Sequence, residues 1–162
     1  MALLKDGKLS DDIYTDVSAL EDLPADGAII VSLPQWQAQR EVLIGRGEPL
    51  GIVLRSDEKP ELIRDDLGHF SVVALDFPVF RDGRAYSYAR LVRRMGWDGE
   101  LRAVGEVLLE QLHYMHRVGF NSFLVTDDDA VAAWETACAD FTVWYQPTGD
   151  GRQTVLARRH SG

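Results

Sequence analysis

Short apolar runs that alternate with amphipathic stretches limit the folds open to this chain more than any other feature. Each run is bounded by turn-forming residues and is followed by a segment with helical spacing. The runs that predict strands are residues 28–33, 50–54, 71–77, 101–105 and 122–125. Alternating strands and helices are typical of an α/β protein with a largely parallel sheet and right-handed crossovers.

The segments between these runs predict helices. Pro34 is well placed to open a helix that reaches Gly45, and a short helix is expected at about 60–67. Small or apolar residues recur at three- and four-residue spacing from Ala85 to Met95, which indicates a further helix. Others are predicted at about 106–118 and, after a capping box that begins at Thr126, to about residue 139.

Domain organisation is predicted to be simple, because 162 residues fit one domain. Residues 1–27 are predicted to be a peripheral arm with at most a small hairpin at the Asp6-Gly7 turn, and residues 28–162 a single α/β domain. A turn at 147–151 predicts a C-terminal hairpin, which would add an antiparallel edge to the sheet.

Two architectures fit this pattern of five or six strands. One is an open doubly wound sheet with helices on both faces, and the other is a half-barrel like part of a (β/α)₈ enzyme. So few strands cannot close a standard barrel, and the open sheet is the preferred prediction.

Composition excludes some classes of partner. The chain has 26 acidic and 17 basic residues and a net charge of -9, which argues against nucleic acid as a partner. Its apolar runs are far shorter than a bilayer span, and its first residues lack the pattern of a secretory signal. With a single cysteine, these features predict a cytoplasmic protein without a membrane segment.

No cofactor motif is visible, so the cofactor stays unknown. Neither a Rossmann glycine fingerprint nor a P-loop follows a predicted strand. Cys138 alone cannot supply an iron–sulfur or zinc thiolate set and is more simply explained as a buried side chain. Glu106, Glu110 and His113 have helical spacing, and Glu110 and His113 form one Glu-x-x-His motif. Di-metal helix bundles need a second copy of this motif, which the chain lacks, so no metal site is predicted.

A basic island stands out in this acidic chain. Between residues 81 and 102 lie six arginines and three carboxylates. Such an island can receive a small oxyanion or an acidic protein partner, or it can be a solvated helix face. Arg90, Arg93 and Arg94 also suit the last turns of a helix, where the dipole favours cations, and they are the residues predicted to dock a partner.

Ligand sites of α/β sheets lie beyond the carboxyl ends of the strands. There the sequence places Asp76 and Glu106, the candidate catalytic groups for proton transfer. The predicted ligand-binding residues are Arg81, Asp82, Gly83, Arg84, Ser87, Arg102 and Gly105. Arg102 is anomalous in a strand that should be apolar on both faces, so it forms either a structural salt bridge or a ligand contact. Ser87 has no acid–base partner visible in the sequence that would make it a nucleophile. It is predicted to contact an anion at the helix start, and the alternative is that it is an ordinary first-turn serine.

Three segments carry a resemblance to a known family. They are FRDGRAYSYARLVRRMG at 80–96, GELRAVGEVL at 99–108 and QLHYMHRVGF at 111–120, with KDG at 5–7 and DD at 11–12 in support. The chain resembles bacterial domain-of-unknown-function family 934, with Glu110 where an Asp is expected. Members are commonly labelled probable oxidoreductases, and their genes tend to lie beside those for assimilatory sulfite reductase and phosphoadenylyl sulfate reductase. No catalytic residue carries over.

The resemblance implies a role in sulfate assimilation, and three functions remain open. The first is an accessory protein that associates with or assists sulfite reductase. The second is a free-standing enzyme or sensor that binds sulfite, sulfate or a phosphorylated metabolite at the basic site. The third is a structural interaction subunit. We rank the accessory role first, because an oxidoreductase without a visible cofactor motif needs a partner to hold the electrons.

Overall fold

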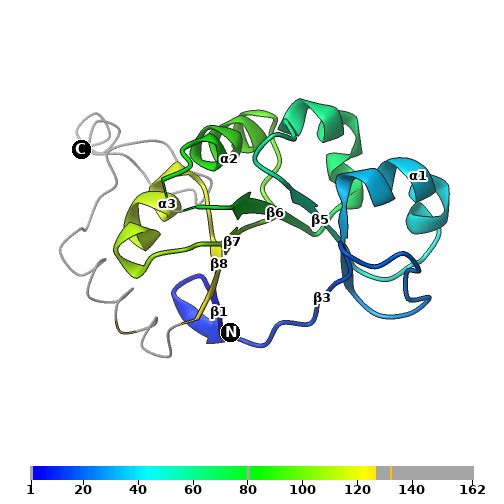
Figure 1. Ribbon diagram of the computed structural model, residues 1–162, viewed down its shortest axis with the longest axis horizontal. Helices are drawn as coiled ribbons and strands as arrows, with labels where there is room; N and C mark the ends of the chain where they lie inside the picture. The colour runs from blue at the N-terminus through cyan, green and yellow to red at the C-terminus, as the bar shows by residue number, and fades with distance from the viewer. Residues whose placement is uncertain (1, 80, 127–131, 133–162) are drawn as a thin grey trace, which may run out of the picture.

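The computed structural model describes residues 2–79, 81–126 and 132. The predicted C-terminal hairpin, the helix toward residue 139 and Cys138 lie outside the described residues. Within them, the five predicted strands are all present, and three strands at the N-terminus join them in one eight-stranded sheet (Figure 1).

The strands and helices are short and follow the sequence pattern closely. The strands are β1 (Ala2–Lys5), β2 (Lys8–Ser10), β3 (Thr15–Asp16), β4 (Ile29–Ser32), β5 (Leu50–Leu54), β6 (Val72–Phe77), β7 (Glu100–Gly105) and β8 (Ser122–Val125). The helices are α1 (Leu33–Ile44), the 3₁₀ helix η1 (Pro60–His69), α2 (Arg84–Arg94), the short η2 (Leu109–Gln111) and α3 (Leu112–Val118). No helix in the described part of the chain is long and apolar enough to cross a membrane.

The strand order settles which face the helices cover. From one edge to the other it is β2-β1-β8-β7-β6-β5-β4-β3, and every pair from β3 to β8 is parallel. Right-handed crossovers that always step to the next strand in the same direction put each helix on the same face. The helices accordingly form one layer over one face of the sheet (Figure 1). The preferred doubly wound sheet was therefore wrong, and the half-barrel is the architecture observed.

The connection between β2 and β3 shows how strongly the sheet curls. These strands are opposite edges of the sheet, yet only residues 11–14 lie between them. Five Cα–Cα steps reach about 19 Å at most, whereas the outer strands of a flat eight-stranded sheet lie about 34 Å apart. We call residues 11–14 the strap, because they cross the open side of the half-barrel between its two edges (Figure 1).

The N-terminal residues are part of the sheet. β1 and β2 form the small hairpin that the sequence predicted, with positive φ at both Asp6 and Gly7, as a tight hairpin turn requires. β1 also pairs antiparallel with β8, and Leu4 is fully buried in the main core. The antiparallel strands of the described sheet thus lie at its N-terminal edge.

The two faces of the sheet bury different residues. The face under the helices carries the main core, to which alternate strand residues such as Val73, Leu75 and Leu101 contribute. The opposite, inner face of the half-barrel holds a smaller apolar cluster, with Tyr14 of the strap packed against it. Its buried members are Ile30, Val53, Val72 and Ala74.

Candidate functional site

The predicted site residues separate into two places in the fold. Asp76, Asp82, Arg84 and Gly105 lie at or just beyond the carboxyl ends of β6 and β7, where a ligand site was expected. Arg102 lies in the middle of β7 and belongs to the inner face. The sequence placed these residues in one site, and the curled sheet holds them in two.

At the carboxyl end, the guanidinium of Arg84 is held by Asp82. Arg84 Nη2 lies 2.7 Å from Asp82 Oδ2, and Arg84 Nε donates to Asp82 Oδ1 at 3.0 Å. The same oxygen accepts the backbone N–H of Arg84, so Asp82 assists the start of α2. These hydrogen bonds lower the pKa of Asp82 to about 2. Arg84 also donates to the hydroxyl of Ser56, in the loop after β5.

Asp76 and Gly105 converge, as their positions at adjacent strand ends predicted. Gly105 has φ +89°, and a Cβ built there would lie 2.7 Å from Asp76 Oδ1 and closer still to the carbonyl oxygen of Phe77. Glycine is therefore required by both the backbone conformation and the close approach of the two strands. Asp76 is mostly buried and lies 3.4 Å from a guanidinium nitrogen of Arg55.

A cavity of about 430 Å³ lies beside Gly105. Its size is within the range of small-molecule sites. Its lining is Gly105, Glu106, Val107, Leu108, Leu124 and Thr126. The backbone N–H of Glu106 donates to the carbonyl of Phe77, which fixes the loop after β7. Of the other predicted ligand residues, Gly83 is the N-cap of α2, and the side chains of Arg81 and Ser87 are exposed.

On the inner face, Arg102 is almost completely enclosed, with 2% of its side chain exposed. Its Nη2 lies 2.9 Å from Glu100 Oε1, and its Nη1 lies 3.1 Å from Asp12 Oδ2 of the strap. Lys5 reaches Glu100 at 3.3 Å, and the ring of Tyr14 lies against the guanidinium, 5.6 Å from centroid to Cζ. We call Lys5, Asp12, Glu100 and Arg102 the inner-face cluster. The salt bridge that was one of the two sequence interpretations of Arg102 is present, and its ligand contact stays a prediction.

Glu100 remains ionised within this cluster in spite of its burial. Burial raises the pKa of its carboxyl group, but the charge of Arg102 and the hydrogen bonds that Arg102 donates outweigh this effect, and the net shift of the pKa is downward. The pKa of the Tyr14 hydroxyl is raised, chiefly by burial. The cluster thus pairs two basic side chains, Lys5 and Arg102, with two acidic ones, Asp12 and Glu100.

The three arginines predicted to dock a partner occupy different environments on α2. Arg93 donates from Nε and Nη2 to the carbonyl of Gly119 at 3.0 and 2.7 Å, and from Nη1 to the carbonyl of Gly99 at 2.9 Å. It thus joins α2 to the end of α3 and to the loop before β7. Arg94 is exposed, and Arg90 is partly buried.

Sequence reasoning missed five residues that complete these two places: Lys5, Asp12, Arg55, Ser56 and Glu100. Glu100 had a detectable signal, because it lies two residues before Arg102 and therefore on the same face of the strand. Asp12 had none, since it is 90 residues from Arg102 in the chain.

The predicted helix at 106–118 begins later than expected. The chain turns at Gly105, η2 starts at Leu109 and α3 at Leu112. Glu106 therefore precedes both helices, Glu110 lies on η2 and His113 on α3, so the three do not share one helix. Among the described residues, no three His, Cys, Asp or Glu side chains are grouped so that they could hold a metal ion.

Comparison with known proteins adds one finding. A family model described as a bacterial protein of unknown function, DUF934, matches residues 51–156. No curated protein matches the chain. The matched region begins in β5, so the strap and the strands β1 to β4 precede it.

Proposed function

The chain belongs to the DUF934 family, and from this we propose that it is an accessory protein of assimilatory sulfate and sulfite reduction that docks onto sulfite reductase. The pathway comes from the resemblance described above, in which the genes of family members tend to lie beside those for sulfite reductase. The choice of an accessory role over a catalytic one rests on the finding that Arg84 and Arg102 are paired with carboxylates of the chain itself.

The observation that supports this choice is that the two arginines best suited to bind an oxyanion substrate already have carboxylate partners. Asp82 binds Arg84 through two nitrogens, and Glu100 and Asp12 bind Arg102. Substrate would have to compete with these internal carboxylates at each arginine. Occupied arginines argue against an open catalytic site for an oxyanion substrate, although a ligand that displaces one of the carboxylates could still bind. A docking protein needs no open catalytic site.

The proposed docking surface is the outward side of α2 near its C-terminal end. Arg94 is exposed there, and Arg90 lies one turn before it. A local positive potential on an acidic chain steers encounter with an acidic patch of a partner, even though net charge opposes general association. Arg93 is excluded from this surface, because its guanidinium holds the carbonyls of Gly99 and Gly119.

Affinity capture with two charge-reversal variants tests the proposal. Tagged protein is recovered from cells grown on sulfate, and sulfite reductase activity is measured in the eluate. The variants are Arg94→Glu on α2 and Arg64→Glu on η1, which change the same exposed residue type on different helices. We expect the wild type and Arg64→Glu to recover the reductase activity, and Arg94→Glu to recover much less of it at low salt, because charge reversal weakens the encounter with an acidic patch. No recovery by the wild type, or equal loss in both variants, would contradict the proposal.

A second candidate is the free-standing enzyme or sensor, and the cavity beside Gly105 favours it. The cavity lies where α/β proteins bind small molecules. If the protein instead binds an oxyanion at the predicted basic site through Arg84, sulfite or sulfate should raise the melting temperature of the purified wild type and not that of Arg84→Ala. A partner recovered in cells without any ligand effect would leave the structural interaction subunit as the alternative to an accessory role.

A further inference from the structure

We propose that the carboxylate of Asp12 is an internal ligand that occupies an anion site on the inner face of the half-barrel. A small monovalent oxyanion displaces this carboxylate from Arg102 and thereby releases the strap. The proposal adds a ligand site and a conformational response to the docking role and does not depend on that role.

The first argument is the charge of the inner-face cluster. The sheet itself supplies Arg102, Lys5 and Glu100, which together carry one positive charge. Asp12, which reaches in from the strap, supplies the negative charge that makes the cluster neutral. Arg102 and Glu100 are the buried pair, whereas Lys5 is 42% exposed and its charge is solvated. Glu100 accepts from Nε and Nη2 of Arg102 and leaves Nη1 to Asp12, so the sheet residues define a position where one buried donor of a cation needs an acceptor oxygen.

The geometry around Arg102 shows where that anion sits. The Nε and Nη2 atoms of Arg102 both donate to Glu100 Oε1, at 3.2 and 2.9 Å. Its Nη1 is turned to the strap and donates to Asp12 Oδ2 at 3.1 Å. One carboxylate oxygen thus fills this position, and an oxygen of formate or hydrogensulfite has the charge and size to replace it.

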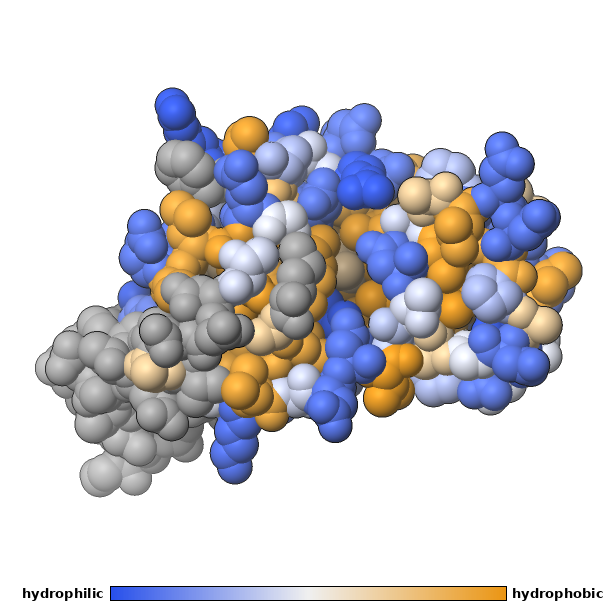
Figure 2. All heavy atoms as spheres, turned by 60° about the horizontal axis from the view of Figure 1, so that its bottom comes forward, coloured by the Kyte–Doolittle hydropathy of each residue, from blue (hydrophilic) through white to orange (hydrophobic). Residues whose placement is uncertain are grey.

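The strap is attached in a way that permits exchange. Asp12 is 30% exposed although its partner Arg102 is 2% exposed, so water and solutes reach the carboxylate from outside. A cavity of about 660 Å³ borders it. The lining is Ala2, Leu3, Leu9, Ser10, Asp11, Asp12 and Leu124. On this side of the molecule apolar side chains reach the surface between hydrophilic ones (Figure 2).

Displacement of Asp12 would loosen a short segment with a distinct boundary. Asp12 Oδ1 accepts the backbone N–H of Tyr14, so the carboxylate also fixes the turn of the strap. From Thr15 onward the chain is held by backbone hydrogen bonds to Ala28 and by pairing with β4. The conformational change is therefore expected at residues 11–14 and not in β3.

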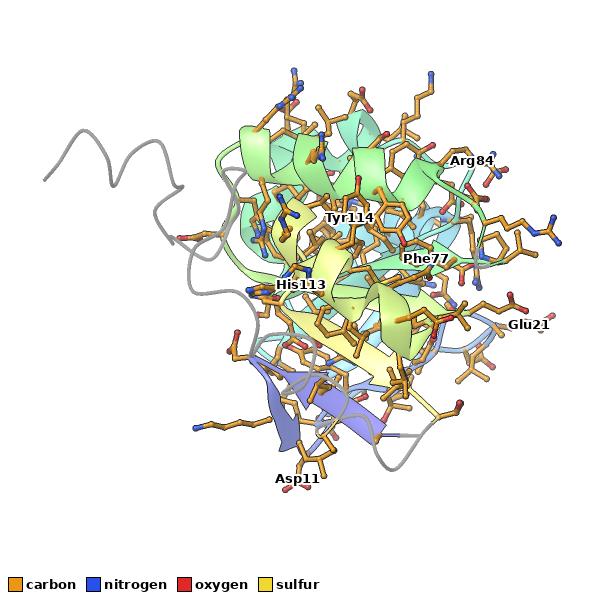
Figure 3. The ribbon with its side chains drawn as sticks, turned by 90° about the vertical axis from the view of Figure 1, so that its left-hand side faces the viewer. Asp11, Glu21, Phe77, Arg84, His113 and Tyr114 are labelled. Atoms are coloured by element: carbon orange, nitrogen blue, oxygen red, sulfur yellow. The ribbon has the colours of Figure 1, made fainter. Side chains whose placement is uncertain are left out.

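Asp11 provides a matched control. It is the neighbouring strap residue, carries the same charge and is exposed. Its side chain points outward at the edge of the molecule (Figure 3). Asp11→Asn and Asp12→Asn therefore make the same change in net charge, and Asp12→Asn alone changes the anion that faces Arg102.

The test is hydrogen exchange of the purified full chain with sodium formate or sodium sulfite, each against sodium chloride at equal ionic strength. We expect both oxyanions to raise exchange at residues 11–14 of the wild type in a saturable way, and chloride to have no such effect. An effect of formate alone would restrict the ligand to planar carboxylates, and an effect of sulfite alone to sulfur oxyanions. Unchanged exchange with both would overturn the proposal.

Affinity in the variants gives a second, independent measurement. While the Asp12 carboxylate occupies the site, the apparent affinity for an added oxyanion is reduced in proportion to the fraction of molecules in which the site is free. Removal of this internal competitor should raise the apparent affinity by the same factor. The concentration of formate or sulfite needed to raise the melting temperature half-maximally should fall about tenfold or more in Asp12→Asn, and should not change in Asp11→Asn. Equal values in the two variants would overturn the proposal. Neither measurement involves sulfite reductase, so a negative result here leaves the docking proposal as it was.

Discussion

Arg84 and Arg102 both pair with carboxylates, and their exposure to water gives these pairs different roles. The side chain of Arg84 is 56% exposed. Solvent screens ion pairs at such exposed positions, so Asp82 mainly positions Arg84 at the start of α2. Arg102 is enclosed, and removal of one partner from a buried ion pair costs about 3 to 5 kcal/mol. Arg102 therefore has to keep an anionic partner, from Asp12 or from a bound oxyanion in its place, whereas Arg84 can exchange Asp82 for water.

Replacement of Asp82 by Asn should alter how stability depends on pH. The pKa of Asp82 is about 2 in the folded chain, below its ordinary value of 3.8. A lowered pKa adds stability above the ordinary value, and this stability is lost as pH falls from about 4 to about 2. Melting temperatures of Asp82→Asn should accordingly fall less steeply than those of the wild type across this range. Asp98→Asn, a change in an exposed loop, serves as the control, and parallel curves for all three proteins would contradict the assignment.

At the scale of elements, the close approach of the carboxyl ends of β6 and β7 depends on one glycine. Gly105 ends β7 with a positive φ and lies against the carbonyl of Phe77 and the carboxylate of Asp76. The turn at Gly105 also explains why the helix expected from residue 106 begins only at Leu109. Helical spacing in the sequence cannot reveal such a turn, because the positive φ depends on how closely two strand ends approach.

Alanine substitutions at two glycines should separate backbone strain from steric contact. Gly96 has φ +87°, close to the value at Gly105, but a Cβ there would meet nothing within 4 Å. Gly96→Ala should lower the free energy of unfolding by about 1 to 2 kcal/mol through the left-handed conformation alone. Gly105→Ala should lower it by about 3 kcal/mol or more, because a backbone carbonyl must also move. Urea unfolding measures both, and equal losses would show that the ends of β6 and β7 separate easily.

For the whole molecule, the sequence pattern predicts the elements but not the side of the sheet to which each helix turns. A doubly wound sheet and a half-barrel contain the same alternation of strands and helices, and they differ only in strand order. The short strap excludes a flat sheet, but this inference requires that β2 and β3 be known as the two edges. The proximity of Asp76 and Gly105 was predictable, because it requires only that both residues end neighbouring parallel strands. The pairing of Asp12 with Arg102 was not, because it requires the curl of the sheet to be known.

The N-terminal third of the chain, which contains strands β1 to β4, should also be essential for folding. A chain of residues 48–162 contains the whole region matched by the family model, but it lacks β4, the partner of β5, and β1, the partner of β8. It also loses the strap and buried side chains such as Leu4 and Trp36. Two bare strand edges and an open inner face should leave this fragment unfolded or aggregated.

Circular dichroism and amide NMR spectra of the fragment alone measure this directly. Co-expression with residues 1–47 should restore a folded complex, because the break then falls in the loop between α1 and β5 and all eight strands are present. A fragment 48–162 that unfolds cooperatively by itself would contradict the argument. It would mean that the parallel strands β5 to β8 and their helices are a stable unit, to which the N-terminal hairpin and the strap are attached as a separable cover.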